Sequence, residues 1–172
     1  AAWERGDIKA AYTWQPTLAK LLDSGRTLTD SKEMAEKGYI TANVVIGRKA
    51  FTQKYPELVA DFISALSKAG DLYRENPQKA AEITGKELGL EAEVTLHQMH
   101  GTTWKTREEL LSQDFFGTVD NPGDFAKIMK DTSDFLENQD SIDNSPSQEN
   151  FNEYVNPEYI KMSLENDNST NN

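Results

Sequence analysis

The sequence predicts an α/β fold, and three observations lead to this prediction. Short apolar runs with β-branched and aromatic residues lie at 8–14, 27–29 and 41–46, as expected for strands. The run Asn43-Val-Val-Ile46 is nearly continuous, which is typical of a strand buried on both faces of a sheet. Segments between and after these runs have the apolar spacing of helices, most clearly from Pro56 onward. We therefore expect a three-stranded parallel sheet with helices on both faces.

Capping signals and apolar spacing define the expected helices. Asp30-x-x-Glu33 and Thr106-x-x-Glu109 have the capping-box pattern of a helix start. Asn76-Pro77 ends one helix and begins the next. The expected helices occupy residues 14–23, 30–38, 56–76, 77–88 and 91–99, with further helices opening near 106, 121 and 151. The helix from Pro56 should bury one regular apolar face, formed by Leu58, Val59, Phe62, Ile63, Leu66, Ala69, Leu72 and Tyr73.

Composition excludes several classes of protein. The chain has 172 residues, which is enough for one domain with its own core. Its formal net charge is −11 and the sequence contains no basic patch, so we expect no nucleic-acid partner. No apolar run approaches the ~20 residues of a membrane span. The absence of cysteine excludes disulfides and thiolate metal sites.

The most informative segment runs from Trp3 to Pro16. It indicates a helix end closed by Gly6, a short apolar strand, and a new helix with Pro16 in its first turn. Trp14 and Gln15 then lie at the carboxyl end of a strand, where open α/β sheets bind ligands. An aromatic wall at that position would exclude water from a small ligand. A core tryptophan packed between strand and helix would give the same sequence pattern.

The same segment carries a resemblance to a known family. Gly-Asp-Ile-x-Ala-Ala-Tyr-x-Trp-x-Pro, at residues 6–16, resembles the second-lobe signature of periplasmic substrate-binding proteins for taurine, alkanesulfonates and related compounds. Residues 26–31, 44–57 and 150–155 resemble, in that order, the next strand, the return strand with its long helix, and the closing helix of the family. The match covers roughly residues 1 to 165. Gln15 stands where the family often has an acid, which leaves the polarity of the ligand open.

The resemblance implies a fold and a place within it. The family has a two-lobed, type II periplasmic-binding-protein clamshell whose lobes are three-layer α/β/α structures. By this resemblance the chain is the C-terminal half of such a protein. Residues 1–40 would form the end of the second lobe, and residues 41–165 the crossover strand and the C-terminal helices of the first lobe. Residues 166–172 are Asn-rich and are expected to form a disordered tail.

The resemblance also implies a function. The chain would belong to the solute-binding component of an ABC importer, and would capture a small sulfonate-like solute such as taurine by closure of the two lobes, without catalysis. Its partners would be the solute, the transporter permease and the missing N-terminal half of the same protein. It would act outside the cytoplasm, in the periplasm or as a membrane-anchored lipoprotein. Two alternatives stay open: an enzyme on the same fold, similar to the pyrimidine-forming proteins of thiamine synthesis, or a non-catalytic sensor or interaction domain.

Five further residues are candidate ligand contacts. Asp30 and Ser31 follow a predicted strand and begin a helix, where backbone N–H groups and the serine hydroxyl could hold an anionic group. Asp30 could instead accept hydrogen bonds from a ligand amine, and a plain helix cap would explain both residues equally well. By the resemblance, Tyr39 and Thr41 lie where the chain crosses between lobes. Trp104 lies in a loop at residues 101–106 that could reach the rim of a cleft.

No cofactor and no metal is expected. His97 and His100 are the two histidines of the chain, and Glu93 lies one turn earlier on the same predicted helix. Such spacing can present three metal ligands on one helix face, but it is common by chance, so we predict that these residues bind no metal. The sequence contains no nucleophile elbow, no phosphate-binding loop and no dinucleotide-binding glycine motif, and it therefore predicts no catalytic residue.

Overall fold

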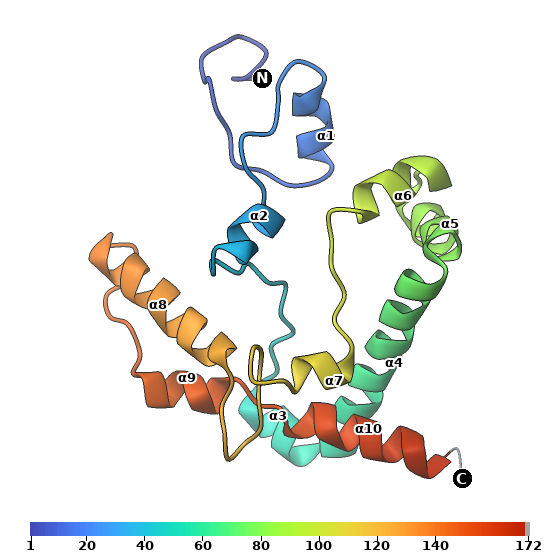
Figure 1. The fold of residues 1–172 in the computed structure, drawn as a ribbon, viewed down its shortest axis with the longest axis vertical. Coiled ribbons are helices and arrows are strands. Elements are labelled where there is room, and N and C mark those ends of the chain that lie inside the picture. The colour runs from blue at the N-terminus through green and yellow to red at the C-terminus, as the bar shows by residue number, and fades with distance from the viewer. Residues whose placement is uncertain (171–172) are drawn as a thin grey trace. The chain divides into compact units, whose positions relative to one another are not determined.

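The computed structural model describes residues 1–170, which form ten α-helices (Figure 1). Several helices begin and end where the sequence predicts, because proline and glycine mark their ends. Pro56 occupies the first turn of its helix, and Gly89 takes a positive φ just after another helix ends. The helices are α1 Thr17–Leu22, α2 Ser31–Glu36, α3 Lys49–Lys54, α4 Pro56–Glu75, α5 Pro77–Leu88, α6 Ala92–Met99, α7 Arg107–Leu110, α8 Asp124–Asn138, α9 Gln148–Tyr154 and α10 Glu158–Thr170.

The predicted α/β fold is wrong for the part of the chain that the structure describes. Residues 1–170 contain no β-strand, and their β-pairing is limited to an isolated antiparallel bridge between Gly117 and Pro122. The three apolar runs at 8–14, 27–29 and 41–46 have no regular secondary structure. These residues therefore form no three-layer α/β/α lobe of a clamshell.

The reason for this error is that strand pairing is not a local property. A strand is stable when its N–H and C=O groups bond to a neighbouring strand, and within residues 1–170 the three runs do not pair with one another. β-Branched residues predict an extended backbone, but they do not provide that neighbour. The run interpreted as buried on both faces is in fact exposed, with 70% of Val45 and 90% of Ile46 accessible to solvent.

The predicted disordered tail is also corrected. Helix α10 continues to Thr170, so residues 166–170 are helical, and residues 171–172 lie outside the described residues. The Asn-rich composition predicted disorder because it offers little apolar surface to bury. Polar contacts supply the missing interaction: Asn166 donates a hydrogen bond to Glu57 on α4 at 2.9 Å, and Asp167 binds residues of two other helices.

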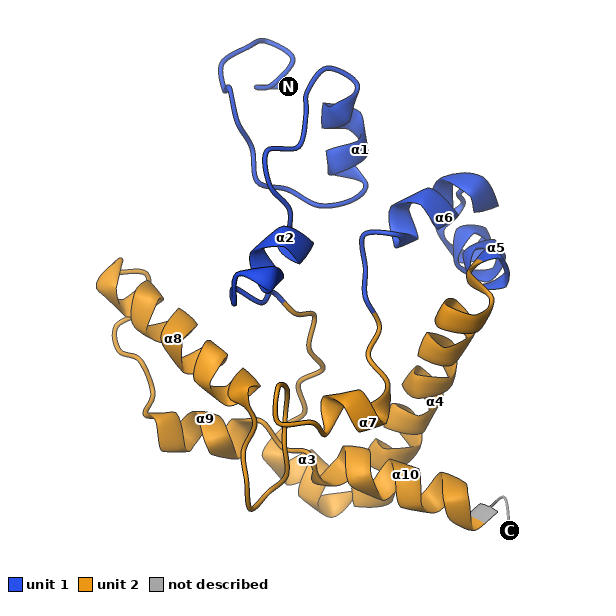
Figure 2. Ribbon diagram, viewed as in Figure 1, with its two compact units in different colours: residues 1–41, 78–103 blue, residues 42–77, 104–172 orange. Residues whose placement is uncertain are grey.

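The chain divides into two compact units (Figure 2). Unit 1 consists of Ala1–Thr41 and Gln78–Thr103, and unit 2 consists of Ala42–Pro77 and Trp104–Asn172. Unit 1 therefore holds α1, α2, α6 and most of α5. The long helix α4 and all the helices from α7 onward belong to unit 2.

Unit 2 is organised by the packing of α10 along α4. The contact is made by small residues, since Ala60 on α4 and Ser163 on α10 have no accessible surface and Ser64 is 7% exposed. Small side chains let two helix backbones approach closely. The apolar face predicted for α4 is corrected in part, because Leu58 is 56% and Phe62 50% exposed. The helix therefore buries its Ala–Ser stripe, and part of its large apolar stripe remains on the surface.

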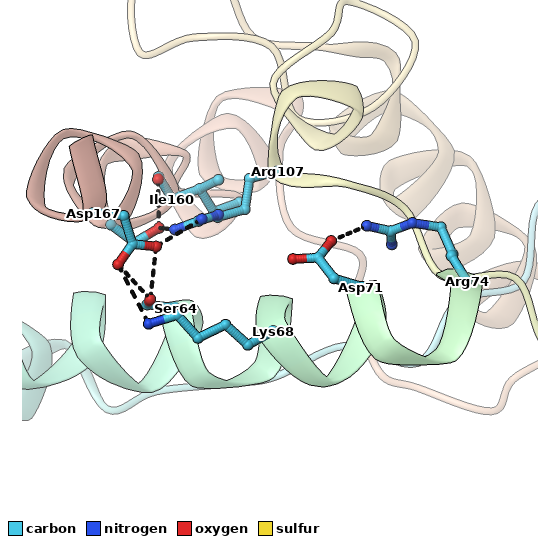
Figure 3. A network of polar contacts seen from close by, with 8 residues as sticks. Ser64, Lys68, Asp71, Arg74, Arg107, Ile160 and Asp167 are labelled. Carbon is cyan, nitrogen blue, oxygen red and sulfur yellow. Dashed lines mark hydrogen bonds and ion pairs between the residues drawn. The ribbon is translucent and has the colours of Figure 1, made fainter. Parts of the chain in front are cut away.

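The carboxylate of Asp167 joins three helices of unit 2 (Figure 3). It accepts hydrogen bonds from the hydroxyl of Ser64 on α4 at 2.8 and 2.9 Å, and it forms an ion pair with Arg107 on α7 at 2.8 Å. Lys68 on α4 adds a longer ion pair of 3.6 Å. Arg107 also donates to the hydroxyl of Ser163 at 3.2 Å. The Ser64 hydrogen bond, followed by that of Arg107, holds the pKa of the Asp167 carboxyl below its ordinary value.

The remaining helices of unit 2 are held by capping and by aromatic contacts. The predicted capping box at the start of α7 is confirmed: Thr106 accepts from the backbone N–H of Glu109, whose carboxylate accepts from that of Thr106. Helix α8 packs against α9, where Phe125 and Phe151 are the buried aromatic residues. The Phe125 ring centroid lies 5.3 Å from that of Phe116, and the Phe151 ring centroid 5.7 Å from that of Tyr154.

In unit 1, α5 and α6 form a helix–turn–helix around Gly85. Gly85 lies within α5, and a Cβ atom there would lie 2.8 Å from both the Leu90 carbonyl oxygen and the Thr95 hydroxyl, so the close approach of the chain after α5 requires glycine. Ala80 and Ala81 on α5 and Thr95 on α6 are buried. The Leu90 N–H bonds back to the Gly85 carbonyl at 2.8 Å, which closes the end of α5.

We predict that enlarging Ser163 destabilises the protein. Its side chain is fully buried between helices, so Ser163→Val would overpack the contact and cost about 1–3 kcal/mol of unfolding free energy. Urea unfolding of the variant measures this. Ser169→Val is the matched control, because Ser169 lies on the exposed part of the same helix and should change stability by less than about 0.5 kcal/mol. Equal effects of the two substitutions would contradict the packing described here.

We predict that the stabilisation provided by Asp167 depends on pH. The pKa of Asp167 is lowered in the folded protein. At pH values between this lowered pKa and the ordinary aspartate pKa of about 3.9, the unfolded chain therefore binds the proton more readily than the folded protein does. The contribution is therefore complete above about pH 5 and is lost as the pH falls through the folded value. Asp167→Asn should destabilise the protein near pH 7 and much less at low pH, as measured by urea unfolding at each pH. The exposed ion pair of Lys127 and Asp131 gives the control Asp131→Asn, for which a comparable pH-dependent loss would contradict the prediction.

Candidate functional site

Unit 1 contains a small surface hollow that brings together aromatic, hydroxyl and carboxylate side chains. Its volume is about 180 Å³, below the ~300–1,000 Å³ of sites for drug-sized ligands, so it suits a solute of a few heavy atoms. It is lined by Tyr12, Thr29, Asp30, Ser31, Met34, Tyr39 and Thr41. All of these residues come from one continuous stretch of 30 residues in unit 1.

The wall of the hollow is built around the short helix α2. Asp30 is extended at φ −133°, and its Oδ1 accepts a hydrogen bond from the backbone N–H of Glu33 at 2.8 Å, which caps the helix. After the helix Gly38 takes φ +90°, a conformation open mainly to glycine. The N–H of Tyr39 then bonds back to the carbonyl of Met34 at 2.9 Å. The cap and the turn place both ends of α2 at the same hollow.

The charge of this wall is negative. Asp30 is the one ionised residue among the seven that line the hollow. Glu33 lies just behind it: its Oε2 accepts from the hydroxyl of Thr29 at 3.0 Å, and its Oε1 forms an ion pair with Lys37 at 3.0 Å. The ammonium of Lys37 is therefore bound to Glu33. Asp30 is thus the acidic residue of a lining that has no basic side chain, and most of the accessible surface of the hollow is apolar.

Two tyrosines also belong to the lining. Tyr12 is 81% and Tyr39 67% exposed, so much of each side chain is accessible to a ligand. Aromatic faces attract ammonium groups, and the attraction increases when the group is desolvated. Ser31 and Thr41 are also lining residues, and a hydroxyl side chain can donate a hydrogen bond to an oxyanion. The residue types in the lining are those that could recognise an amine or an acidic group at the edge of a mainly apolar hollow.

Four of the seven residues predicted from sequence lie together in this hollow: Asp30, Ser31, Tyr39 and Thr41. Trp14 and Gln15 belong to the same unit but do not line it. The Trp14 side chain is 74% exposed and is therefore not the core residue that the alternative interpretation required. Gln15 accepts a hydrogen bond from the N–H of Ala19 at 3.2 Å, and so serves the first turn of α1.

Trp104 lies in unit 2, where it packs against α4. Its ring centroid is 6.4 Å from that of Tyr73, and a Cβ atom built on Gly70 would lie 3.0 Å from the indole. Arg74 donates to the Trp104 carbonyl at 3.4 Å. The indole is 38% exposed. Within its own unit, Trp104 is thus largely a packing residue of the segment leading to α7.

Three lining residues were not predicted: Tyr12, Thr29 and Met34. Signals for two of them were present in the sequence. Thr29 directly precedes Asp30, and Met34 lies four residues after it, on the same face of α2. Tyr12 was part of the quoted segment but was assigned to a buried strand, so the strand prediction concealed its exposure. The hollow forms because the chain turns at Gly38 and brings Tyr39 back toward Met34. The prediction of strands on either side of this helix did not include that turn.

A second hollow in unit 1 has different chemistry. It is lined by Trp3, Glu4, Arg5, Gly6, Ile8, Lys9 and Ser24. Arg5 is ion-paired to Asp7 at 2.7 Å, and the Trp3 indole donates to Ser24 at 3.0 Å. Across residues 1–170, no group of three His, Cys, Asp or Glu side chains is placed to hold a metal ion. His97 lies in the last turn of α6 and His100 at its C-cap.

Comparison with known proteins decides the family. Residues 1–86 match the family model described as the substrate binding domain of an ABC-type glycine betaine transport system, and these residues include the whole first hollow. The chain belongs to this family. The resemblance found in the sequence to substrate-binding proteins of ABC transporters is therefore confirmed.

A curated relative extends the match along the chain. The protein is 30% identical to the taurine-binding periplasmic protein of Escherichia coli strain K12 over 172 aligned positions, which cover 94% of this chain and 49% of the relative. The chain thus spans about half the length of the curated relative it matches. Within the described residues of this substrate-binding domain, no helix is long and apolar enough to cross a membrane.

Proposed function

We propose that this chain is part of the solute-binding component of an ABC importer and captures a small sulfonate-like solute such as taurine without catalysing a reaction. Family membership supports the transport role, and the taurine-binding relative supports the solute class. The observation that carries the proposal furthest is the hollow beside α2. It lies inside the stretch matched by the family model and combines a carboxylate, hydroxyls and aromatic faces.

We propose that the two ends of the solute are held by different residues. The Asp30 carboxylate would accept hydrogen bonds from the ammonium group, which would also lie against the rings of Tyr12 and Tyr39. The hydroxyls of Ser31 and Thr41 would donate to the sulfonate oxygens. The volume of about 180 Å³ is consistent with a molecule of taurine's size.

Trp14, Gln15 and Trp104 remain proposed ligand contacts of the whole protein. Trp14 is the best supported of them, because its exposed indole offers an apolar wall close in sequence to the hollow. We also propose that solute binding closes the protein, with residues up to about 40 and residues 41–165 on different moving parts. The break between the two units after Thr41 supports a boundary at that point, whereas Gln78–Thr103 are grouped with residues 1–41 and not with the rest of 41–165. Closure would be a population shift, driven by the solute's greater affinity for the closed state.

The partners follow from this role. A solute-binding component delivers its ligand to a transporter permease, so we propose a permease partner and the remainder of the solute-binding protein as further partners. The relative is named as a periplasmic protein, which supports an extracytoplasmic location, whether free in the periplasm or anchored as a lipoprotein.

We predict that Asp30→Asn in the full-length protein weakens taurine binding at least tenfold, or about 1.4 kcal/mol. Asparagine caps a helix about as well as aspartate, so the substitution removes the charge without removing the cap. Isothermal titration calorimetry with taurine measures the change. Asp23→Asn at the end of α1 is the matched control, since Asp23 does not line the hollow. Unchanged affinity in a folded Asp30→Asn protein would contradict the proposed site, and absence of taurine binding by the parent protein would contradict the proposed solute.

A further inference from the structure

Glu33 is a second carboxylate attached to the wall of the hollow. Its backbone N–H donates to Asp30 at 2.8 Å, and its side chain accepts from the hydroxyl of Thr29 at 3.0 Å. Both of these partners line the hollow, whereas Glu33 does not. The arrangement departs from the capping box that the sequence predicts, in which the Glu33 carboxylate would bond back to the N–H of Asp30. In the structure this carboxylate is directed to Thr29 and Lys37 instead.

Lys37 cancels the charge of Glu33. Its ammonium lies 3.0 Å from Glu33 Oε1, one turn further along the helix. The two other charged residues of α2, Lys32 and Glu36, have opposite signs and are both exposed. With the Glu33–Lys37 pair intact, Asp30 therefore supplies the net charge of −1 at this wall. Without Lys37, two uncompensated carboxylates would lie at or just behind it.

We infer that the Glu33–Lys37 ion pair determines the charge selectivity of the hollow, so that it favours a zwitterion over a net cation. This inference rests on the proposed function of the hollow. One carboxylate matches the single ammonium of an aminosulfonate. A second uncompensated carboxylate would attract simple cations more strongly and would repel the sulfonate end. Lys37 thus acts as a specificity-determining residue through Glu33, without touching the solute.

The expected effect is modest because the ion pair is in water. The side chains of Glu33 and Lys37 are about half exposed, at 50% and 56%. One uncompensated charge in such surroundings changes the affinity of a charged ligand by roughly two- to fivefold at low salt. Salt near 1 M reduces the Debye length to about 3 Å and should abolish the effect.

The test uses the full-length protein, two opposite single substitutions and their combination. Lys37→Gln leaves Glu33 uncompensated, Glu33→Gln leaves Lys37 uncompensated, and the double variant removes both charges. Three probes share a two-carbon chain and differ in charge: taurine is a zwitterion, ethylammonium a cation and ethanesulfonate an anion. Affinities are measured by NMR titration at low salt and again near 1 M salt.

Lys37→Gln should raise the affinity for ethylammonium relative to ethanesulfonate by about four- to twenty-five-fold, because the two affinities move in opposite directions and their changes multiply. Glu33→Gln should lower this ratio by a similar factor, and the double variant should restore the parent ratio. A role of Lys37 in folding alone would not give opposite shifts that cancel in the double variant. The Lys37→Arg variant keeps the charge and should retain the parent ratio.

Two results would overturn the inference separately from the proposed function. If the parent binds taurine but Lys37→Gln changes all three affinities by the same factor, or leaves the ratio unchanged, the ion pair does not set selectivity. The same conclusion follows if ethylammonium or ethanesulfonate remains unbound in every variant. If the parent binds none of the three probes, the proposed function fails and the inference fails with it.

Discussion

The close contact between α4 and α10 is the constraint on which unit 2 depends. Ala60 and Ser163 have no accessible surface, and Ser64 nearly none, so the two helices meet through small side chains. Burying serine hydroxyls requires hydrogen-bond partners, and here the Ser64 hydroxyl donates to Asp167. Asp167 is in turn paired with Arg107, which holds the start of α7 against α10. The Asp167 carboxylate therefore satisfies Ser64, while the Ser163 hydroxyl donates to the Ile160 carbonyl and accepts from Arg107.

The helices of this chain were largely predictable, because their signals are local. Pro56, Pro77, the Thr106–Glu109 capping box and Gly38 mark helix ends through their own backbone chemistry. The absence of strands and the buried face of α4 could not be predicted in this way, because both depend on which other segment of the chain packs or pairs there. Ile46 and Phe62 have the residue types of a core, but nothing in the sequence states which surface they meet. The end of helix α10 shows the opposite error. Its composition predicts disorder, but polar contacts with other helices hold it in place.

The candidate site was predictable to a similar extent. Asp30 was found because a carboxylate at a helix start has a clear chemical signature, and Tyr39 and Thr41 followed from the resemblance. Trp14 and Trp104 were chosen as aromatic residues near a predicted strand end and in a loop. The structure places the first outside the hollow and the second against α4. Tyr12 was missed because it was assigned to a buried strand. Residue type alone does not show whether a side chain is exposed.

Helix α2 forms one wall of the candidate site in this chain. A helix of six residues, capped by Asp30 and ended by Gly38, aligns a carboxylate with aromatic rings and hydroxyls. A crystal structure of the full-length protein with taurine tests this most directly. The account predicts the ammonium nitrogen within hydrogen-bond distance of the Asp30 carboxylate, against the rings of Tyr12 and Tyr39. Taurine bound at another surface, with Asp30 and both tyrosines free of ligand, would contradict it.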